Sequence, residues 1–158
     1  MSKPRFFLSY SLHRAGWATA RLDHGQPVEM TVSYLHDSLL DLATSVLLVE
    51  RGANEARVIF MDEPGEHQLL LKSDFQDGLR YELRWYDDWE SWGFKESNQH
   101  RVLATGHVAV RRYKHQVANV LHEIYERYGP EEYQKLWGEH PFPTKQYRDI
   151  LDQLDRSP

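Results

Sequence analysis

Residues 68–86 read QLLLKSDFQDGLRYELRWY, and this stretch predicts a β-hairpin. Two segments typical of strands, 68–72 and 79–86, flank the sequence QDG at 76–78, which favours a tight turn because Asp and Gly tolerate its backbone angles. In the second segment, aromatic and aliphatic residues alternate with charged ones, as in a strand with one buried and one solvated face. The stretch therefore indicates an antiparallel sheet whose neighbouring strands are joined by short turns.

Further strand segments lie on both sides of this hairpin, in two groups separated by a helix. Asp37 or Ser38 is the expected helix cap, and Asp41 follows Ser38 at the spacing of a capping box. Gly52 ends the apolar pattern of this helix. The other expected strands, rich in aromatic and β-branched residues, are 6–13, 17–23, 28–34, 58–61 and 102–110.

The last third of the chain is predicted to be helical. Apolar residues recur at helical spacing from Tyr113 to Tyr128, and the sequence Gly-Pro at 129–130 then interrupts the pattern. A short helix follows up to Trp137, and a last helix is expected from Thr144.

This order of elements predicts an α+β protein. We expect a single antiparallel meander sheet of six or seven strands, with helices packed on one face. The chain is interpreted as one domain over residues 1–158, with the sheet and first helix in 5–110 and the C-terminal helices in 111–156.

Composition narrows the classes of function. Of 158 residues, 41% are hydrophobic and 27% are charged, which is typical of a folded chain. The net charge of −5 disfavours nucleic-acid binding, because such proteins depend on attraction to phosphates. Apolar runs are far shorter than the ~20 residues that span a bilayer, and no secretory signal pattern is present. We therefore expect a cytoplasmic protein that binds neither nucleic acid nor membranes.

No motif of a known catalytic chemistry stands out. His122 and Glu126 lie at the spacing of half an HExxH zinc motif, but no third ligand is evident and there is no cysteine. Nucleophile elbows and glycine-rich phosphate loops are also missing. We expect no metal site, cofactor or catalytic residue, and an enzymatic role is disfavoured. His107, on the last expected strand, is a candidate acid or base only if it is buried beside a suitable partner.

The segment 87–100 lacks any strand or helix period and is unusually aromatic and acidic. Exposed aromatic side chains with a charged rim are typical of binding surfaces. The alternative is a loop folded back on the sheet, with its aromatic residues anchoring it. Acids of the neighbouring turn, Asp62, Glu63 and Glu66, would extend the rim if both turns share one end of the sheet. The candidate partner-binding residues are Tyr86, Asp87, Asp88, Trp89, Glu90, Trp92 and Phe94.

Four short sequences punctuate the expected elements: AGWA at 15–18, YLHDSL at 34–39, EPGE at 63–66 and HPFP at 140–143. With the overall plan, they resemble a family of uncharacterised single-domain bacterial proteins, which implies no catalytic residue. In size, acidity and α/β plan, the chain is also similar to the immunity proteins that neutralise bacterial toxins. This similarity implies a protein partner.

The sequence thus predicts a non-enzymatic protein-binding module, with an immunity-type or accessory role, that recognises a basic partner through the acidic and aromatic loop. One alternative is a small-molecule enzyme or ligand carrier with its site between the sheet and the helices. Another is a homo-oligomer that uses the same loop as its interface.

Overall fold

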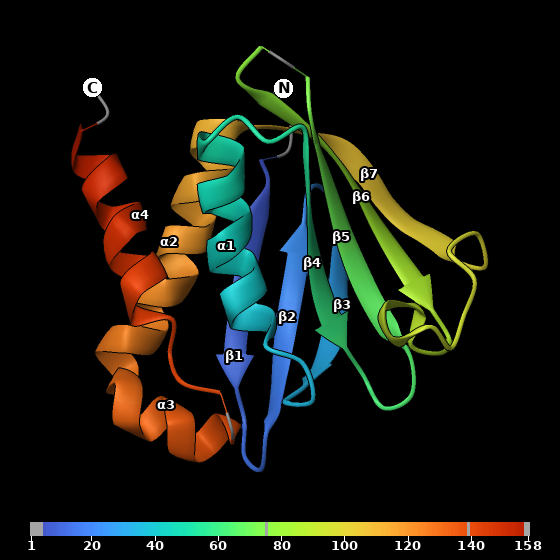
Figure 1. The fold of residues 1–158 in the computed structure, drawn as a ribbon, viewed down its shortest axis with the longest axis horizontal. Coiled ribbons are helices and arrows are strands. Elements are labelled where there is room, and N and C mark those ends of the chain that lie inside the picture. The colour runs from blue at the N-terminus through green and yellow to red at the C-terminus, as the bar shows by residue number, and fades with distance from the viewer. Residues whose placement is uncertain (1–4, 75, 139, 157–158) are drawn as a thin grey trace.

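The computed structural model describes residues 5–74, 76–138 and 140–156, so the ends of the expected domain, 1–4 and 157–158, lie outside the described residues (Figure 1). The described chain is α+β, as predicted. Its elements are β1 (Phe7–Leu12), β2 (Trp17–Asp23), β3 (Pro27–Ser33), α1 (Ser38–Glu50), β4 (Glu55–Met61), β5 (Glu66–Ser73), β6 (Gly78–Tyr86), the 3-10 turn η1 (Glu90–Trp92), β7 (Arg101–Ala109), α2 (Val110–Arg127), α3 (Gly129–Trp137) and α4 (Thr144–Arg156).

The strands form two antiparallel sheets, in the orders β1-β2-β3 and β4-β5-β6-β7. The prediction of a single sheet was therefore wrong, although the number of strands was right. Short turns join successive strands within each group, except β6 and β7, which residues 87–100 connect. The two groups are joined through α1, and no local signal along that connection makes β3 pair with β4. These two strands contact each other without a shared ladder.

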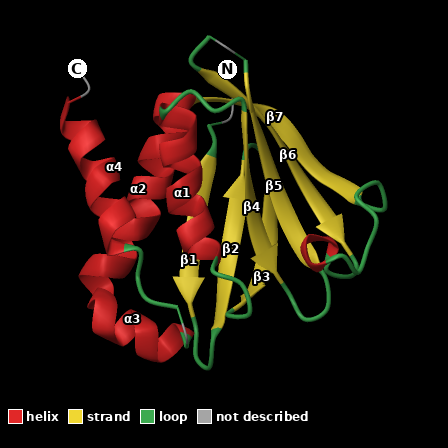
Figure 2. Cartoon of the chain, viewed as in Figure 1, coloured by secondary structure: helices red, strands yellow, loops and turns green. Residues whose placement is uncertain are grey.

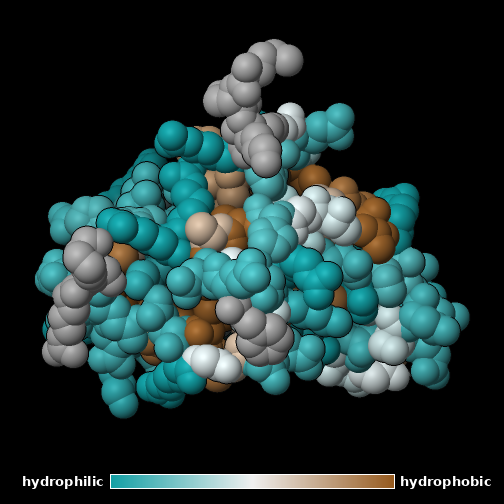
Figure 3. Space-filling view, turned by 90° about the horizontal axis from the view of Figure 1, so that it is seen from above, coloured by the Kyte–Doolittle hydropathy of each residue, from teal (hydrophilic) through white to brown (hydrophobic). Residues whose placement is uncertain are grey.

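The four helices gather on one side of the molecule and the strands on the other (Figure 2). Helix α1 packs on β4, whereas α2 packs on β1 and contacts α1, α3 and α4. One hydrophobic core contains side chains from both sheets and from all four helices. From above, the surface is mostly hydrophilic, and hydrophobic side chains reach it in a few separate patches (Figure 3).

A local hydrogen bond and a long-range one both stabilise the start of α1. Asp37 is the cap, and its carboxylate accepts a hydrogen bond of 3.2 Å from the backbone N–H of Leu40. Asp41 does not complete a capping box. Its carboxylate instead accepts a hydrogen bond of 3.0 Å from the backbone N–H of Ile59 in β4 and lies 2.7 Å from His36 Nε2, while the Ser38 N–H donates to the His36 carbonyl.

Element boundaries differ from the predictions by a few residues. β4 begins at Glu55 and not at Val58, because its first residues pair with the end of β5, from Glu55 opposite Lys72 onward. Within the described ranges, none of the helices combines the length and apolar character needed to cross a bilayer.

Candidate functional site

Residues 87–100 connect β6 to β7 and fold back over the four-stranded sheet, on the face turned away from the helices. We call this face the outer face. Side chains on such a face are ordinarily solvated. Five of them are nevertheless buried here: Ile59, Met61, Glu66, Gln68 and Tyr86. The apolar members of this group lie outside the main core. The loop covers them, at the end where β5 begins and β6 finishes (Figure 2).

A buried carboxylate fixes the loop to the sheet. The Ser91 hydroxyl donates a hydrogen bond of 2.7 Å to Glu66 Oε1, and the Ser91 backbone N–H donates one of 3.2 Å to Oε2. The Gln68 amide donates to Glu66 at 2.6 Å and to Glu90 at 2.7 Å. Arg57 also lies 3.4 Å from Glu90. These hydrogen bonds are shielded from water and hold this part of the loop on the sheet.

Aromatic side chains anchor the loop on either side of this network. The indole N–H of Trp89 donates to the backbone oxygen of Asp62 at 2.8 Å. The Tyr86 hydroxyl donates to the backbone oxygen of Ser97 at 2.7 Å. The first contact brings the loop against the turn between β4 and β5, where Gly65 lets the backbone approach, because a Cβ there would collide with the Trp85 ring. The two turns therefore share one end of the sheet.

Two aromatic side chains of the loop are exposed. Trp92 is 49% exposed and Phe94 is 62% exposed. Both pack edge-on against the half-buried Trp89, with ring centroids 4.9 and 6.2 Å from it. We call these three residues the aromatic platform. A rigid loop thus holds a cluster of apolar rings in contact with solvent.

Acidic side chains flank the aromatic platform along the chain and occur in the turn that Trp89 contacts. Asp87 and Glu96 of the loop are exposed, and so is Glu63 of the neighbouring turn. Lys95 pairs with Asp87 at 2.8 Å, which partly offsets the acidic charge. Glu66 does not belong to this rim, contrary to the extension considered from the sequence, because it is fully buried under the loop.

The structure thus divides the seven candidate residues into two groups. Tyr86 and Glu90 hold the loop on the sheet, as the fold-back alternative describes, and Trp89 contributes to both roles. The residues available to a partner are Asp87, Asp88, Trp92 and Phe94, with the edge of Trp89.

His107 is not buried, so the condition for its candidacy as an acid or base is not met. Its side chain is 56% exposed, and its Nε2 lies 3.0 Å from Asp74 Oδ2. It stands opposite Arg80 on the outer face, and not between the sheet and the helices. Successive side chains of a strand point to opposite faces of the sheet, and the register with the neighbouring strand determines which face His107 occupies.

His67 is the buried histidine that the sequence reasoning missed. Its ring packs 4.7 Å from the ring of Trp85, and burial, with the nearby charge of Arg101, lowers its pKa from 6.5 to about 4. His122, by contrast, lies on the exposed side of α2, with Nδ1 3.0 Å from the Tyr147 hydroxyl. Within the described ranges, no group of three His, Cys, Asp or Glu side chains is arranged to bind a metal ion.

Exposed rings, a rigid support and an acidic rim lie together at one end of the four-stranded sheet. Comparison with known proteins finds no family model, curated sequence or solved structure that matches the chain.

Proposed function

We propose that this protein is a non-enzymatic binding module that recognises a basic partner protein through the aromatic platform and its acidic rim. An immunity-type or accessory role is the most concrete form of this function. The observation that carries the proposal is the exposure of Trp92 and Phe94 on a loop that buried hydrogen bonds hold in place.

Rigidity matters here because association costs conformational entropy. A loop already fixed by Glu66 and Gln68 loses little freedom when a partner covers it. Tryptophan and other aromatic residues at the centre of an interface commonly dominate its binding energy. Trp92 and Phe94 are therefore the expected anchors, and each has apolar area to bury.

The acidic rim supplies selectivity for a basic surface. Asp87, Asp88 and Glu96 flank the rings along the loop, and Glu63 lies in the turn that Trp89 contacts. The chain as a whole carries a net charge of −5. Complementary charge accelerates encounter with a cationic partner and disfavours acidic competitors. Screening weakens such attraction, so association should slow as salt concentration rises.

The test compares three forms of the tagged protein as baits in a lysate of its own source organism. Trp92→Ala with Phe94→Ala removes both anchors. Phe7→Ala is the matched control, because Phe7 is also an exposed aromatic residue, 54% exposed, but lies on β1 of the other sheet. A stoichiometric partner retained by the wild type and the control, and lost by the double variant, supports the proposal.

Calorimetry with the purified partner makes the test quantitative. The double variant should bind at least about tenfold more weakly, as expected for hot-spot residues. Asp87→Asn with Asp88→Asn should weaken binding and flatten its salt dependence, while leaving the fold intact. A partner that binds all three baits equally would overturn the proposal. Concentration-dependent sedimentation of the protein alone, abolished by the double variant, would identify a homo-oligomer instead.

A further inference from the structure

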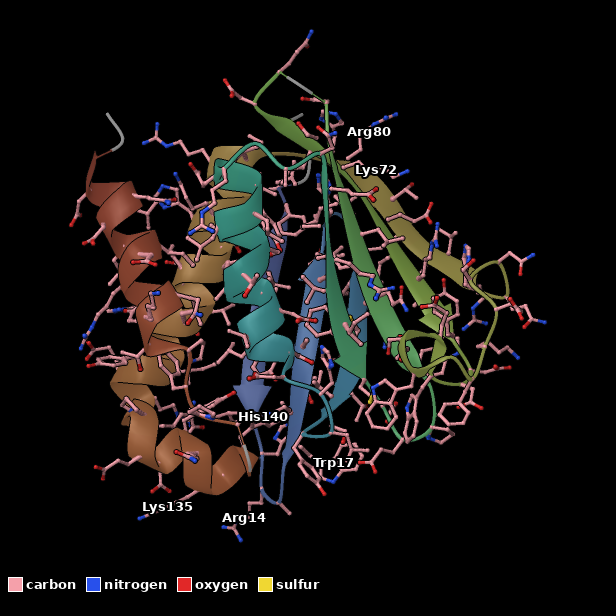
Figure 4. All side chains as sticks on the ribbon, viewed as in Figure 1. Arg14, Trp17, Lys72, Arg80, Lys135 and His140 are labelled. Carbon is pink, nitrogen blue, oxygen red and sulfur yellow. The ribbon has the colours of Figure 1, made fainter. Side chains whose placement is uncertain are left out.

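The other end of the same outer face carries a pair of cations. Lys72 of β5 and Arg80 of β6 stand directly opposite each other in the antiparallel register, and both are exposed. Figure 4 shows them at the upper end of the four-stranded sheet. Like charges in directly opposite positions destabilise a sheet, so this arrangement calls for an explanation.

The pair differs from the other basic side chains of this face in having no acidic partner within 4 Å in the described part of the chain. Arg57 pairs with Glu90, Arg84 pairs with Glu82, and the His107 ring lies against Asp74. Among the described residues, neither Lys72 nor Arg80 forms an ion pair, although Glu55 stands opposite Lys72 in the register. These two cations therefore have no ion-pair partner within 4 Å among the described residues, on a protein whose net charge is negative.

These two side chains line a groove of about 480 Å³. Its other walls are mixed in character: Leu70 supplies apolar surface and Thr105 supplies a hydroxyl. Glu82 also lines the groove, but its carboxylate is engaged by the guanidinium of Arg84. The volume lies within the range of small-molecule sites and exceeds what a bare inorganic anion fills.

His107 completes the rim in a fixed orientation. The Asp74 carboxylate accepts hydrogen bonds from the backbone N–H groups of Gln76 and Gly78, at 2.8 and 3.0 Å. Its other oxygen lies 3.0 Å from His107 Nε2. Asp74 is thus held by backbone donors and by the imidazole, and forms no ion pair with Lys72 or Arg80.

We propose that this groove binds a small organic phosphate, with the phosphate group between Lys72 and Arg80. The guanidinium of Arg80 presents paired N–H donors that match phosphate oxygens, and the Lys72 ammonium adds a compact charge. Two cations balance the charge of a phosphate monoester, which relieves their mutual repulsion. The organic part lies against Leu70.

This site is separate from the aromatic platform. Glu66, beneath the loop, and Lys72 are six residues apart along β5, which corresponds to about 20 Å in a strand. Substitutions at Lys72 and Arg80 therefore leave the loop and its anchors untouched. The phosphate proposal and the protein-binding proposal can fail independently of each other.

The test is a titration of the full-length protein with phenyl phosphate, followed by the amide shifts of its NMR spectrum. The expected result is saturable shifts confined to β5, β6 and β7 around the groove, and tighter binding of phenyl phosphate than of inorganic phosphate. Lys72→Ala and Arg80→Ala should each weaken binding by about tenfold or more, since each removes a charge-assisted hydrogen bond. Because both residues are exposed, the NMR spectra of the two variants without ligand should otherwise match that of the wild type.

Arg14→Ala and Lys135→Ala are the matched controls. Both residues are exposed, neither has an ion-pair partner among the described residues, and both lie at the opposite end of the molecule (Figure 4). They should bind phenyl phosphate as the wild type does. Equal losses of affinity in the control variants, or amide shifts spread over the whole surface, would show that phenyl phosphate is attracted by positive charge in general. Either result would overturn the proposal.

Two further experiments distinguish a free organic phosphate from other occupants of the groove. Vesicles containing phosphatidic acid present the same group on a membrane, and binding to them without a saturable response to phenyl phosphate would contradict a small-molecule site. Shifts in the groove that depend only on protein concentration would show that a second copy of the chain occupies it, and would also reject the proposal.

Discussion

Ser91 donates two hydrogen bonds to Glu66, one from its hydroxyl at 2.7 Å and one from its backbone N–H at 3.2 Å. The two residues are 25 positions apart in the chain. Glu66 is fully buried, so its carboxylate depends on these donors and on Gln68 in place of water. This pair turns an acidic loop into a rigid support for exposed aromatic rings.

Ser91→Ala should destabilise the protein and loosen the loop. The substitution removes a donor from a buried carboxylate, a change that costs about 1–3 kcal/mol. Denaturant unfolding should show this loss, and hydrogen exchange should accelerate within residues 87–100. Ser97→Ala is the control, because Ser97 is exposed and takes part through its backbone oxygen. Equal stability of the two variants would refute the anchoring role.

The three rings of the aromatic platform should contribute unequally to folding. Trp89→Ala removes the hydrogen bond to the Asp62 carbonyl and half-buried packing, and should cost about 2 kcal/mol. Trp92→Ala or Phe94→Ala should change the free energy of unfolding by no more than about 0.5 kcal/mol, as for other exposed residues. Urea unfolding of the three variants measures this. A large cost at Trp92 would assign that ring a structural role instead.

His67 should make stability fall as the solution becomes acidic. Its pKa is lowered from 6.5 to about 4 in the folded protein, chiefly by burial. Between these two pH values the unfolded chain binds more protons than the native one. The free energy of unfolding is therefore undiminished by His67 above pH 6.5 and falls as pH decreases toward 4. The loss amounts to about 3 kcal/mol in total and levels off below the folded pKa.

Unfolding experiments across this pH range check the effect of His67. His67→Phe keeps a ring against Trp85 and should remove most of the slope. His115→Ala, at an exposed position of α2, should keep the slope of the wild type. Parallel pH profiles for the wild type and His67→Phe would contradict the assignment.

Removing the hydroxyl from two buried tyrosines should change the stability of the protein differently. The Tyr113 hydroxyl is 2.7 Å from the Ser45 hydroxyl, whereas that of Tyr133 has no hydrogen-bond partner. Burial raises the pKa of both groups well above the usual value, so both are neutral.

Tyr113→Phe should therefore cost about 1 kcal/mol, and Tyr133→Phe should be neutral or stabilising by a similar amount. Thermal and chemical denaturation of the two variants, measured side by side, provide the comparison. A loss of stability in Tyr133→Phe as large as that in Tyr113→Phe would show that its hydroxyl is satisfied in solution.

Much of the secondary structure could be predicted because its signals act over a few residues. The QDG turn at 76–78 joins β5 to β6, Asp37 caps α1, and the break at Gly129 separates α2 from α3. The concentration of aromatic and acidic residues in 87–100 also marked the candidate surface. In each case, the side chains that decide the conformation lie beside the backbone they affect.

Other features depend on contacts between distant parts of the chain. The division into two sheets, the exposure of His107 and the burial of His67 follow from which strands pair and which face the core covers. Likewise, composition could not separate anchoring from exposed aromatic residues in the loop, since Trp89 and Trp92 are chemically alike.

The sequence by itself determined the hairpins, the helices and the location of an unusual loop, because local propensities and turn chemistry govern these. Only the tertiary structure decided that Glu66 binds Ser91 beneath that loop and that Lys72 and Arg80 stand unpaired on the same face. The reason is physical: burial and charge neutralisation depend on which side chains surround a group, and the complete fold alone brings those neighbours together.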